Sequence, residues 1–441
     1  MFKTVISLFR NKETRSRILF TLAMLLVFRI GASITIPGID TSKLISGLSS
    51  NALVTMMNIM GAGSWQTFSI FSMGVGPYIT ASIVIELLAM DIIPPLAELQ
   101  KNGQKGRQKM DQITRYTAVV LGFAQAYTLT MTFDSAYGIL VDNSTTTYLY
   151  IATILTAGTF LLVWIGDRIA QFGIGNGISM IIFAGIVANL PYQFSSSFAQ
   201  LVDFTAEGSV VFTGLLKFIV LVVMYIAIIV LVIYTSTATR KIPIQYTSNS
   251  GRGGSKETSF LPLKINSASV MPVIFASTVL VAPKTIMNLI SGLSFYQSSD
   301  FTKKLVEIFD YISDFTTAGG LIIYVVLIFA FTFFYTNLQV DPEKISEDLK
   351  KNGSYIPGVR PGSETTSYVS KVLNRITVFG ALFLCFIAAL PYLLSMFTDI
   401  PSTITMGGTS IIIVVGVALE TVKDLEDKLT KQREYRGFGK R

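Results

Sequence analysis

Long apolar stretches recur along almost the whole chain, and charged residues gather in the segments between them. Most of these stretches have the roughly 20 residues that an α-helix needs to cross about 30 Å of hydrocarbon. Within a bilayer the backbone must satisfy its own hydrogen bonds, so each stretch is expected to be helical. We therefore predict an all-α polytopic membrane protein with ten membrane-spanning helices. The predicted spans are 18–36, 68–90, 114–133, 147–166, 176–193, 211–235, 268–290, 318–337, 376–396 and 409–423.

The second predicted span contains residues that break helices. Gly74, Gly76 and Pro77 interrupt its apolar run, and a glycine-rich stretch at 61–64 precedes them. Pro77 removes a helix hydrogen bond, and the glycines loosen the turn before it. We expect a short half-helix followed by a longer helix.

The ten spans divide into two pseudo-symmetric groups of five, an N-terminal half at 18–193 and a C-terminal half at 211–423. The second span of the C-terminal half also carries prolines, Pro272 and Pro283. Interrupted spans at corresponding places in two halves indicate a pathway along the interface between them. The alternative is that these prolines are ordinary, because proline is tolerated in membrane helices.

Lysine and arginine are unevenly distributed among the segments between spans. The chain has 35 of them against 27 acidic residues, a net charge of +8. The segments 1–17, 91–115, 167–175, 236–267 and 338–375 and the tail from 423 carry 29 of the 35. By the positive-inside rule these segments and both termini, including the tail at 424–441, face the cytoplasm. Topology thus explains the basic excess and argues against a nucleic-acid partner.

The basic segment 1–17 followed by an apolar run also resembles the start of a secretory signal peptide. The apolar run is longer than that of a signal peptide, and nine more spans follow it. We therefore interpret the first span as a retained membrane anchor.

Two cytoplasmic loops are long enough to form structures of their own. In 236–267, extended runs at 241–246 and 260–265 flank a polar tip, which predicts a protruding hairpin. In 338–375, Asp341 and Pro342 are expected to begin a short helix that Gly353 ends. Loops of this length on one face usually bind a partner.

Residue types that carry enzyme chemistry are scarce. The chain has no histidine, and its one cysteine, Cys385, lies within an apolar run. We therefore expect no enzymatic activity, no metal, no cofactor and no intrachain disulfide. Arg29 and Glu86 lie within predicted spans, where ionisable groups commonly mark ion coupling. An ion-coupled transporter is the main alternative, and a membrane-embedded enzyme is a more distant one. Both residues can also lie close to a polar interface of the membrane, which their side chains can reach.

Six motifs, in order along nearly the whole chain, resemble those of the SecY family, the channel subunit of the bacterial Sec translocon. They are FSIFSMGVGPYITASI at 68–83, GIGNGISMIIFAGIVA at 173–188, LPLKIN at 261–266, MPVIFAS at 271–277, PGVRPG at 357–362 and GGTS at 407–410. The resemblance implies two five-helix halves around an hourglass-shaped pore that conducts unfolded secretory proteins outward.

The resemblance also implies a plug in the broken second helix and a central ring of branched apolar side chains. The plug maps to about 60–71 and includes Met60, Gly61, Gly63, Trp65 and Phe68. The alternative for this segment is an interfacial helix anchored by Trp65. The pore ring maps to Val75, Ile79, Ile182, Ile186, Ile274 and Ile413. Val75 departs from the isoleucine usual at its position, and the last assignment can shift by one or two places within 411–413.

A lateral gate is implied between the second and third spans on one side and the seventh and eighth on the other. Thr80, Gln125 and Pro272 map to it, and polar groups there would weaken an apolar seam so that hydrophobic segments can pass into lipid. The cytoplasmic loops are implied to dock a SecA motor ATPase and the ribosome. The expected docking residues are Arg360, Arg240, Lys241, Arg252 and Lys256.

The further partners implied are SecE-like and SecG-like membrane subunits and an unfolded precursor with its signal sequence. The implied location is the bacterial plasma membrane, crossed several times, with both termini in the cytoplasm. The energy for transport would come from SecA with ATP or from the translating ribosome.

Overall fold

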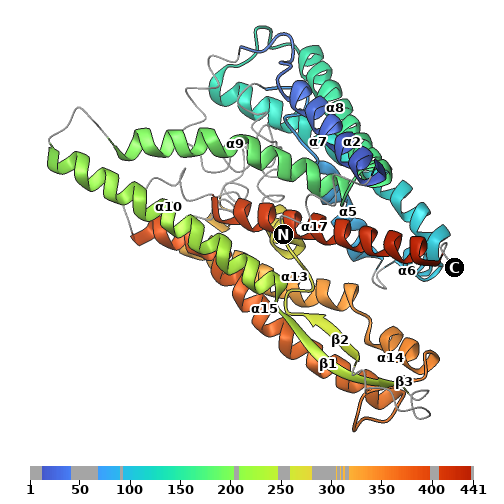
Figure 1. Cartoon of the computed structure of the whole chain (residues 1–441). Coiled ribbons are helices and arrows are strands. Elements are labelled where there is room, and N and C mark those ends of the chain that lie inside the picture. Colours follow the sequence, from blue (N-terminus) through green and yellow to red (C-terminus); the bar gives the residue numbers. More distant parts are fainter. Residues whose placement is uncertain are drawn as a thin grey trace.

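The computed structural model describes residues 12–40, 68–89, 93–202, 208–246, 259–280, 304, 308, 311–312, 317–397 and 407–438. Helices dominate these residues (Figure 1). They are α2 (Lys12–Ala32), α5 (Gly76–Leu88), α6 (Pro94–Lys101), α7 (Gly103–Tyr137), α8 (Thr145–Phe172), α9 (Gly177–Leu201), α10 (Gly208–Thr237), α13 (Ala318–Gln339), α14 (Pro342–Lys351), α15 (Ser363–Phe397) and α17 (Gly407–Phe438). A further short apolar helix is Met271–Leu280.

Every predicted span overlaps one of these helices. Among the described residues, five helices are long and apolar enough to cross a membrane, and they lie in α8, α9, α10, α13 and α15. Helices α2, α7 and α17 each join an apolar segment to a charged one at the end predicted to be cytoplasmic. The prediction of an all-α polytopic membrane protein is confirmed, whereas the exact bounds of the ten spans and the two halves stay predictions.

The described helices pack in two groups that contact each other. Helix α7 packs against α5 and α8, and α8 also contacts α2 and α9. In the second group α15 packs against α13 and α17, and α17 against α10. The groups meet where α9 contacts both α17 and α10, and Figure 1 shows α17 running between them.

Helix α9 is longer than the 176–193 span predicted for it. It continues through Pro191 to Leu201. Phe194 packs edge-on against Tyr225 of α10 with ring centroids 5.5 Å apart, and Phe198 packs in the same way against Phe218 at 5.1 Å. These aromatic contacts with α10 stabilise the additional turns, which the apolar pattern alone does not reveal.

The two long loops that are predicted to be cytoplasmic form one small module. Strand β1 (Thr239–Tyr246) pairs antiparallel with β2 (Ser259–Lys264), which confirms the predicted hairpin. Strand β3 (Ser354–Tyr355), from the second loop, pairs with the other edge of β1, a contact that the sequence did not predict. The predicted short helix is α14, where the Asp341 carboxylate accepts from the backbone N–H groups of Glu343 and Lys344.

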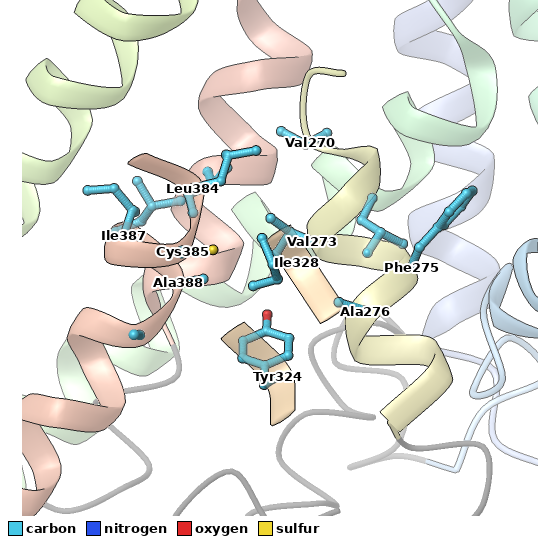
Figure 2. Close-up of a cluster of buried hydrophobic side chains, with 14 of the residues drawn as sticks. Val270, Val273, Phe275, Ala276, Tyr324, Ile328, Leu384, Cys385, Ile387 and Ala388 are labelled. Carbon is cyan, nitrogen blue, oxygen red and sulfur yellow. The ribbon is translucent and has the colours of Figure 1, made fainter. Parts of the chain in front are cut away.

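The largest apolar core lies in the second group of helices (Figure 2). Its side chains come from the helix Met271–Leu280 and from α10, α13, α15 and α17, and Val273, Tyr324, Ile328 and Leu384 are almost completely buried in it. Cys385 is a free, buried member of this core, and its thiol donates to the Val325 carbonyl at 3.3 Å. Ile83 of α5 and Ile186 of α9 also belong to it, so this core joins the two groups.

Candidate functional site

Helix α5 begins at Gly76 after a run of turns at 68–75, which confirms the predicted break in the second span. Within the run, the Ser72 hydroxyl donates to the Ser69 carbonyl at 2.8 Å, and the Gly74 N–H donates to the Phe71 carbonyl at 2.8 Å. Gly74 has φ +57, a conformation that glycine adopts at little cost. Pro77 follows in the first turn of α5, where its missing N–H disrupts no bond.

Four of the predicted plug residues, Met60, Gly61, Gly63 and Trp65, lie outside the described residues. Phe68 is described, and it is fully buried with φ +42. Its ring packs edge-on against Phe133 with centroids 6.1 Å apart. Residues 68–71 form turns, so the expected half-helix does not include them. Phe68 is therefore a fixed core residue at the end of the predicted plug segment.

Five of the six predicted ring residues lie on α5, α9, α17 and the helix Met271–Leu280, and Val75 immediately precedes α5. All six belong to or pack against two apolar cores that are in contact through Ile79 and Ile182. Val75 is buried in a core formed with α2, α8 and α9. Ile186 and Ile274 are buried in the largest core, and Ile413 packs against it. Ile79 and Ile182 are half-buried and contact both cores. Each predicted ring residue therefore has an apolar environment formed by one or both of these cores.

Helix α5 also meets α13 along a seam on the same side as Ile83. The Tyr335 hydroxyl donates to the Glu86 carboxylate at 3.4 Å, and the Ser82 hydroxyl donates to the other carboxylate oxygen at 3.4 Å. Phe275 packs edge-on against the Tyr335 ring with centroids 4.9 Å apart. The second, seventh and eighth predicted spans therefore meet at this one place.

The predicted gate residues, all of which the structure describes, make no hydrogen bond across this seam. The Thr80 hydroxyl donates to the Gly76 carbonyl of its own helix at 3.1 Å. Gln125 is half-buried on α7, and Pro272 is buried at the start of its helix. The polar contact across the seam is instead Glu86–Tyr335, whose partners are 249 residues apart in sequence. The Ser82–Glu86 contact lies within α5 at i and i+4 spacing and gives no local signal for the contact with Tyr335.

Arg360 lies in the turn between β3 and α15, and its side chain is exposed. The Thr365 hydroxyl donates to the Arg360 carbonyl at 2.8 Å, and the Arg360 N–H donates to the Glu364 carboxylate at 3.4 Å. Gly358 and Gly362 on either side have φ +84 and +111. The backbone of the turn is therefore fixed while the guanidinium faces solvent. Arg240 and Lys241 are exposed on β1, and Arg252 and Lys256 lie outside the described residues.

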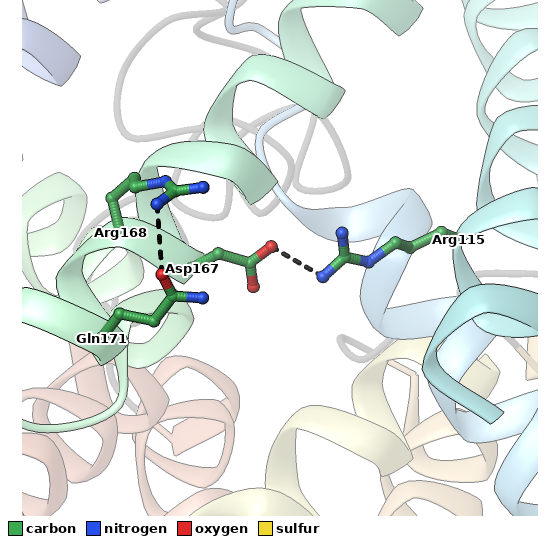
Figure 3. A network of polar contacts seen from close by, with 4 residues as sticks. All are labelled: Arg115, Asp167, Arg168 and Gln171. Atoms are coloured by element: carbon green, nitrogen blue, oxygen red, sulfur yellow. Dashed lines mark hydrogen bonds and ion pairs between the residues drawn. The ribbon is translucent and has the colours of Figure 1, made fainter. Parts of the chain in front are cut away.

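A polar cluster joins α7 to the last turns of α8 (Figure 3). Arg115 of α7 forms an ion pair of 2.7 Å with Asp167 of α8. Arg168 donates to the Gln171 side chain at 3.2 Å and lies over the Trp164 ring. Burial raises the pKa of nearby Asp111, and the Asp167 charge adds to this, while Arg115 opposes it. Because the ion pair is partly exposed, its net stabilisation is small.

The turn between α8 and α9 is fixed by helices of both groups. Its Ile174 N–H donates to the Thr21 hydroxyl of α2 at 3.1 Å, and its Gly175 N–H donates to the Asp424 carboxylate of α17 at 3.0 Å. Within the described part of the chain, no group of three or more acidic or cysteine side chains could hold a metal ion.

A family model for SecY matches residues 69–422 of this chain. The SecY protein translocase subunits of Bacillus subtilis strain 168 and Bacillus licheniformis are 45% and 44% identical to it, over the full length of both chains in each case. This chain belongs to the SecY family. The SecY protein translocase subunit of Staphylococcus aureus strain NCTC 8325 is 43% identical to this chain, again over the full length of both chains.

Solved structures of SecY-type channels share the fold. A protein-conducting channel matches with a TM-score of 0.59 at 16% identity. The match covers 94% of this chain and 92% of that chain. A SecY structure whose plug domain stabilises its closed state has a TM-score of 0.60 at the same identity and coverage. Canine Sec61, from a ribosome-channel complex, has a TM-score of 0.56. At this identity the likeness supports the fold alone.

The motifs of the SecY family select six of the many apolar residues in and around the two cores. Sequence patterns alone do not separate the six ring residues from the many other isoleucines and valines in membrane helices. The structure brings together the residues that the family motifs select, from helices far apart in sequence. It also adds Glu86 and Tyr335, of which neither was among the predicted gate residues.

Proposed function

We propose that this chain is the pore-forming subunit of a Sec protein-conducting channel, through which unfolded secretory proteins leave the cytoplasm. The observation that carries this proposal is that six branched apolar side chains, on or next to four helices, belong to or pack against two cores that Ile79 and Ile182 join. An apolar constriction excludes water and ions when it is empty. Because its side chains are flexible, it can also yield around a passing polypeptide without specifying its sequence.

The seam between α5 and the helices Met271–Leu280 and α13 is the proposed lateral gate, with Thr80, Gln125 and Pro272 near it. Among the described residues of the seam, Ile83 and Phe275 belong to one apolar core, and the Glu86–Tyr335 hydrogen bond joins the two sides. An apolar segment of a precursor could replace the Ile83 packing, whereas it could not satisfy Glu86. Opening would then begin at the apolar part and end with the breaking of the polar contact.

The cytoplasmic module is the proposed docking site for a SecA motor ATPase and for the ribosome, with Arg360 as its principal contact. Arg240 and Lys241 extend the basic surface along β1, and Arg252 and Lys256 are proposed to belong to it. SecE-like and SecG-like subunits complete the proposed assembly. In this arrangement the chain carries out no chemistry itself, both termini are cytoplasmic, and the assembly lies in the bacterial plasma membrane.

The proposed function predicts that vesicles containing the full chain and its small partner subunits import a secretory precursor. Addition of SecA and ATP should make the precursor resistant to external protease, and omission of ATP should leave it sensitive. Precursor that stays sensitive in the presence of both, with the subunits assembled, would contradict the proposal. A solute-dependent ion flux in the same vesicles, abolished by Glu86→Gln, would favour the ion-coupled transporter instead.

The polar contact across the seam gives a second prediction. Tyr335→Phe removes the hydrogen bond to Glu86 but keeps the ring that packs on Phe275, so it should weaken the closed gate by about 1 kcal/mol. Precursors with weakened signal sequences should then be transported roughly fivefold faster, as that energy implies. Tyr234→Phe on the exposed face of α10 is the matched control. Equal rates for the two variants would exclude Glu86–Tyr335 from gating.

A further inference from the structure

Asp134 is a buried carboxylate in the last turn of α7, at the end of that helix predicted to face away from the cytoplasm. A negative charge there is opposed by the helix dipole, and its burial is costly unless hydrogen bonds compensate. One carboxylate oxygen accepts from the Leu140 N–H at 3.0 Å, and the other accepts from the Tyr148 hydroxyl of α8. Asp134 therefore holds the loop that follows α7 against the first turns of α8.

This loop holds the segment that follows α2. The Asp40 N–H donates to the Ile139 carbonyl at 2.9 Å, and the Val141 N–H donates to the Gly38 carbonyl at 3.3 Å. The two segments form an antiparallel bridge at Ile39 and Leu140. Their register is thus set by the position of the 138–141 loop, which Asp134 fixes.

The segment after α2 in turn holds the residues that precede α5. The Ile36 N–H donates to the Phe68 carbonyl at 3.2 Å, and the Ile70 N–H donates to the Ile34 carbonyl at 3.1 Å. Apolar packing follows the same route, because Phe133, next to Asp134, packs on Phe68 in a core that also buries Ile36. A left-handed conformation such as that of Phe68 costs on the order of 1 kcal/mol and persists only where its surroundings hold it.

We propose that Asp134 is a positioning residue for the constriction: through these stacked segments it fixes the start of α5, and with it Val75 and Ile79. This inference rests on the proposed function of the ring. Beyond the 138–141 loop, each hydrogen-bonded link is between backbone groups, which no single side-chain substitution removes, and the Phe133–Phe68 packing runs beside these links. The first link depends on the Asp134 carboxylate, so this residue determines whether the ring side chains on α5 stay in register with Ile182 and Ile274.

The test measures ion leakage through the full chain, reconstituted in vesicles with the subunits that copurify with it. Asp134→Ala should raise the leak about tenfold, a change equivalent to about 1.4 kcal/mol. Asp134→Asn keeps an acceptor for the Leu140 N–H, so it should restore most of the seal. Asp142→Ala, which alters an exposed carboxylate in the same external loop, is the matched control and should leave the leak unchanged.

Tyr148→Phe provides a milder variant that removes one of the two hydrogen bonds, so that the test does not depend on the folding of Asp134→Ala. It should leak more than Asp142→Ala and less than Asp134→Ala. Ile79→Ser combined with Ile182→Ser in the same assay separates the two proposals. If this double variant leaks while Asp134→Ala and Tyr148→Phe match the control, the constriction stands and the role of Asp134 is overturned. If the double variant also fails to leak, the constriction itself is refuted, and this inference with it.

Discussion

Arg360→Glu is expected to reduce motor-driven transport by on the order of 30-fold, corresponding to the ~2 kcal/mol typical of a central interface residue. The turn that carries Arg360 is fixed by the bonds of its backbone to Glu364 and Thr365, so the side chain is presented with little conformational cost. Reversal of its charge would replace attraction to an acidic docking surface by repulsion. The measurement is the rate of ATP-dependent precursor protection in vesicles.

Lys344→Glu is the matched control, because it makes the same charge change at an exposed position on α14. It should retain most of the transport activity. Both variants should reach the membrane in normal amounts, since neither side chain is buried. Loss of the Arg360→Glu protein from the membrane, or equal transport by the two variants, would contradict a docking role for Arg360.

Ile79→Ser combined with Ile182→Ser is expected to raise the ion permeability of the resting channel by at least about tenfold, because an apolar constriction excludes ions only while it stays dry. These two residues contact both cores, so they lie where the two groups of helices meet. Both are half-buried, which limits the loss of stability compared with the ~2–5 kcal/mol of a fully buried truncation. Single-channel conductance in a planar bilayer measures the effect.

Ile219→Ser is the control for this pair, since Ile219 is exposed on α10 and would face lipid. It should leave the conductance at the resting value. A double variant that stays sealed, in a protein that still transports precursors, would show that the seal lies elsewhere along the pathway.

The sequence predicted those features that depend on local patterns. Spans follow from apolar length, the β1–β2 hairpin from two extended runs around a polar tip, and α14 from Asp341 and Pro342 at its start. The start of α5 also followed from Gly76 and Pro77. In each of these cases the determining residues lie within a few positions of the element.

Contacts between distant segments could not be predicted in this way. Strand β3 has two residues, too few for a pattern, and the Glu86–Tyr335 contact joins residues that no local signal relates. The identity of the ring residues came from family motifs, because an isoleucine on a membrane helix has the same local pattern whether it faces lipid, core or pore. The sequence does carry a signal at Asp134, because an acidic residue in the last turn of a helix is opposed by the helix dipole.

The most direct test of the central claim is to locate a polypeptide that is arrested during transport. A photoreactive amino acid at Ile79 or Ile274 should crosslink to a precursor stalled by a folded C-terminal domain, and only in the presence of the motor and ATP. The same amino acid at Ile219, on the exposed face of α10, should give no crosslink. Crosslinks at Ile219 with none at Ile79 or Ile274 would show that the polypeptide does not pass through the proposed constriction.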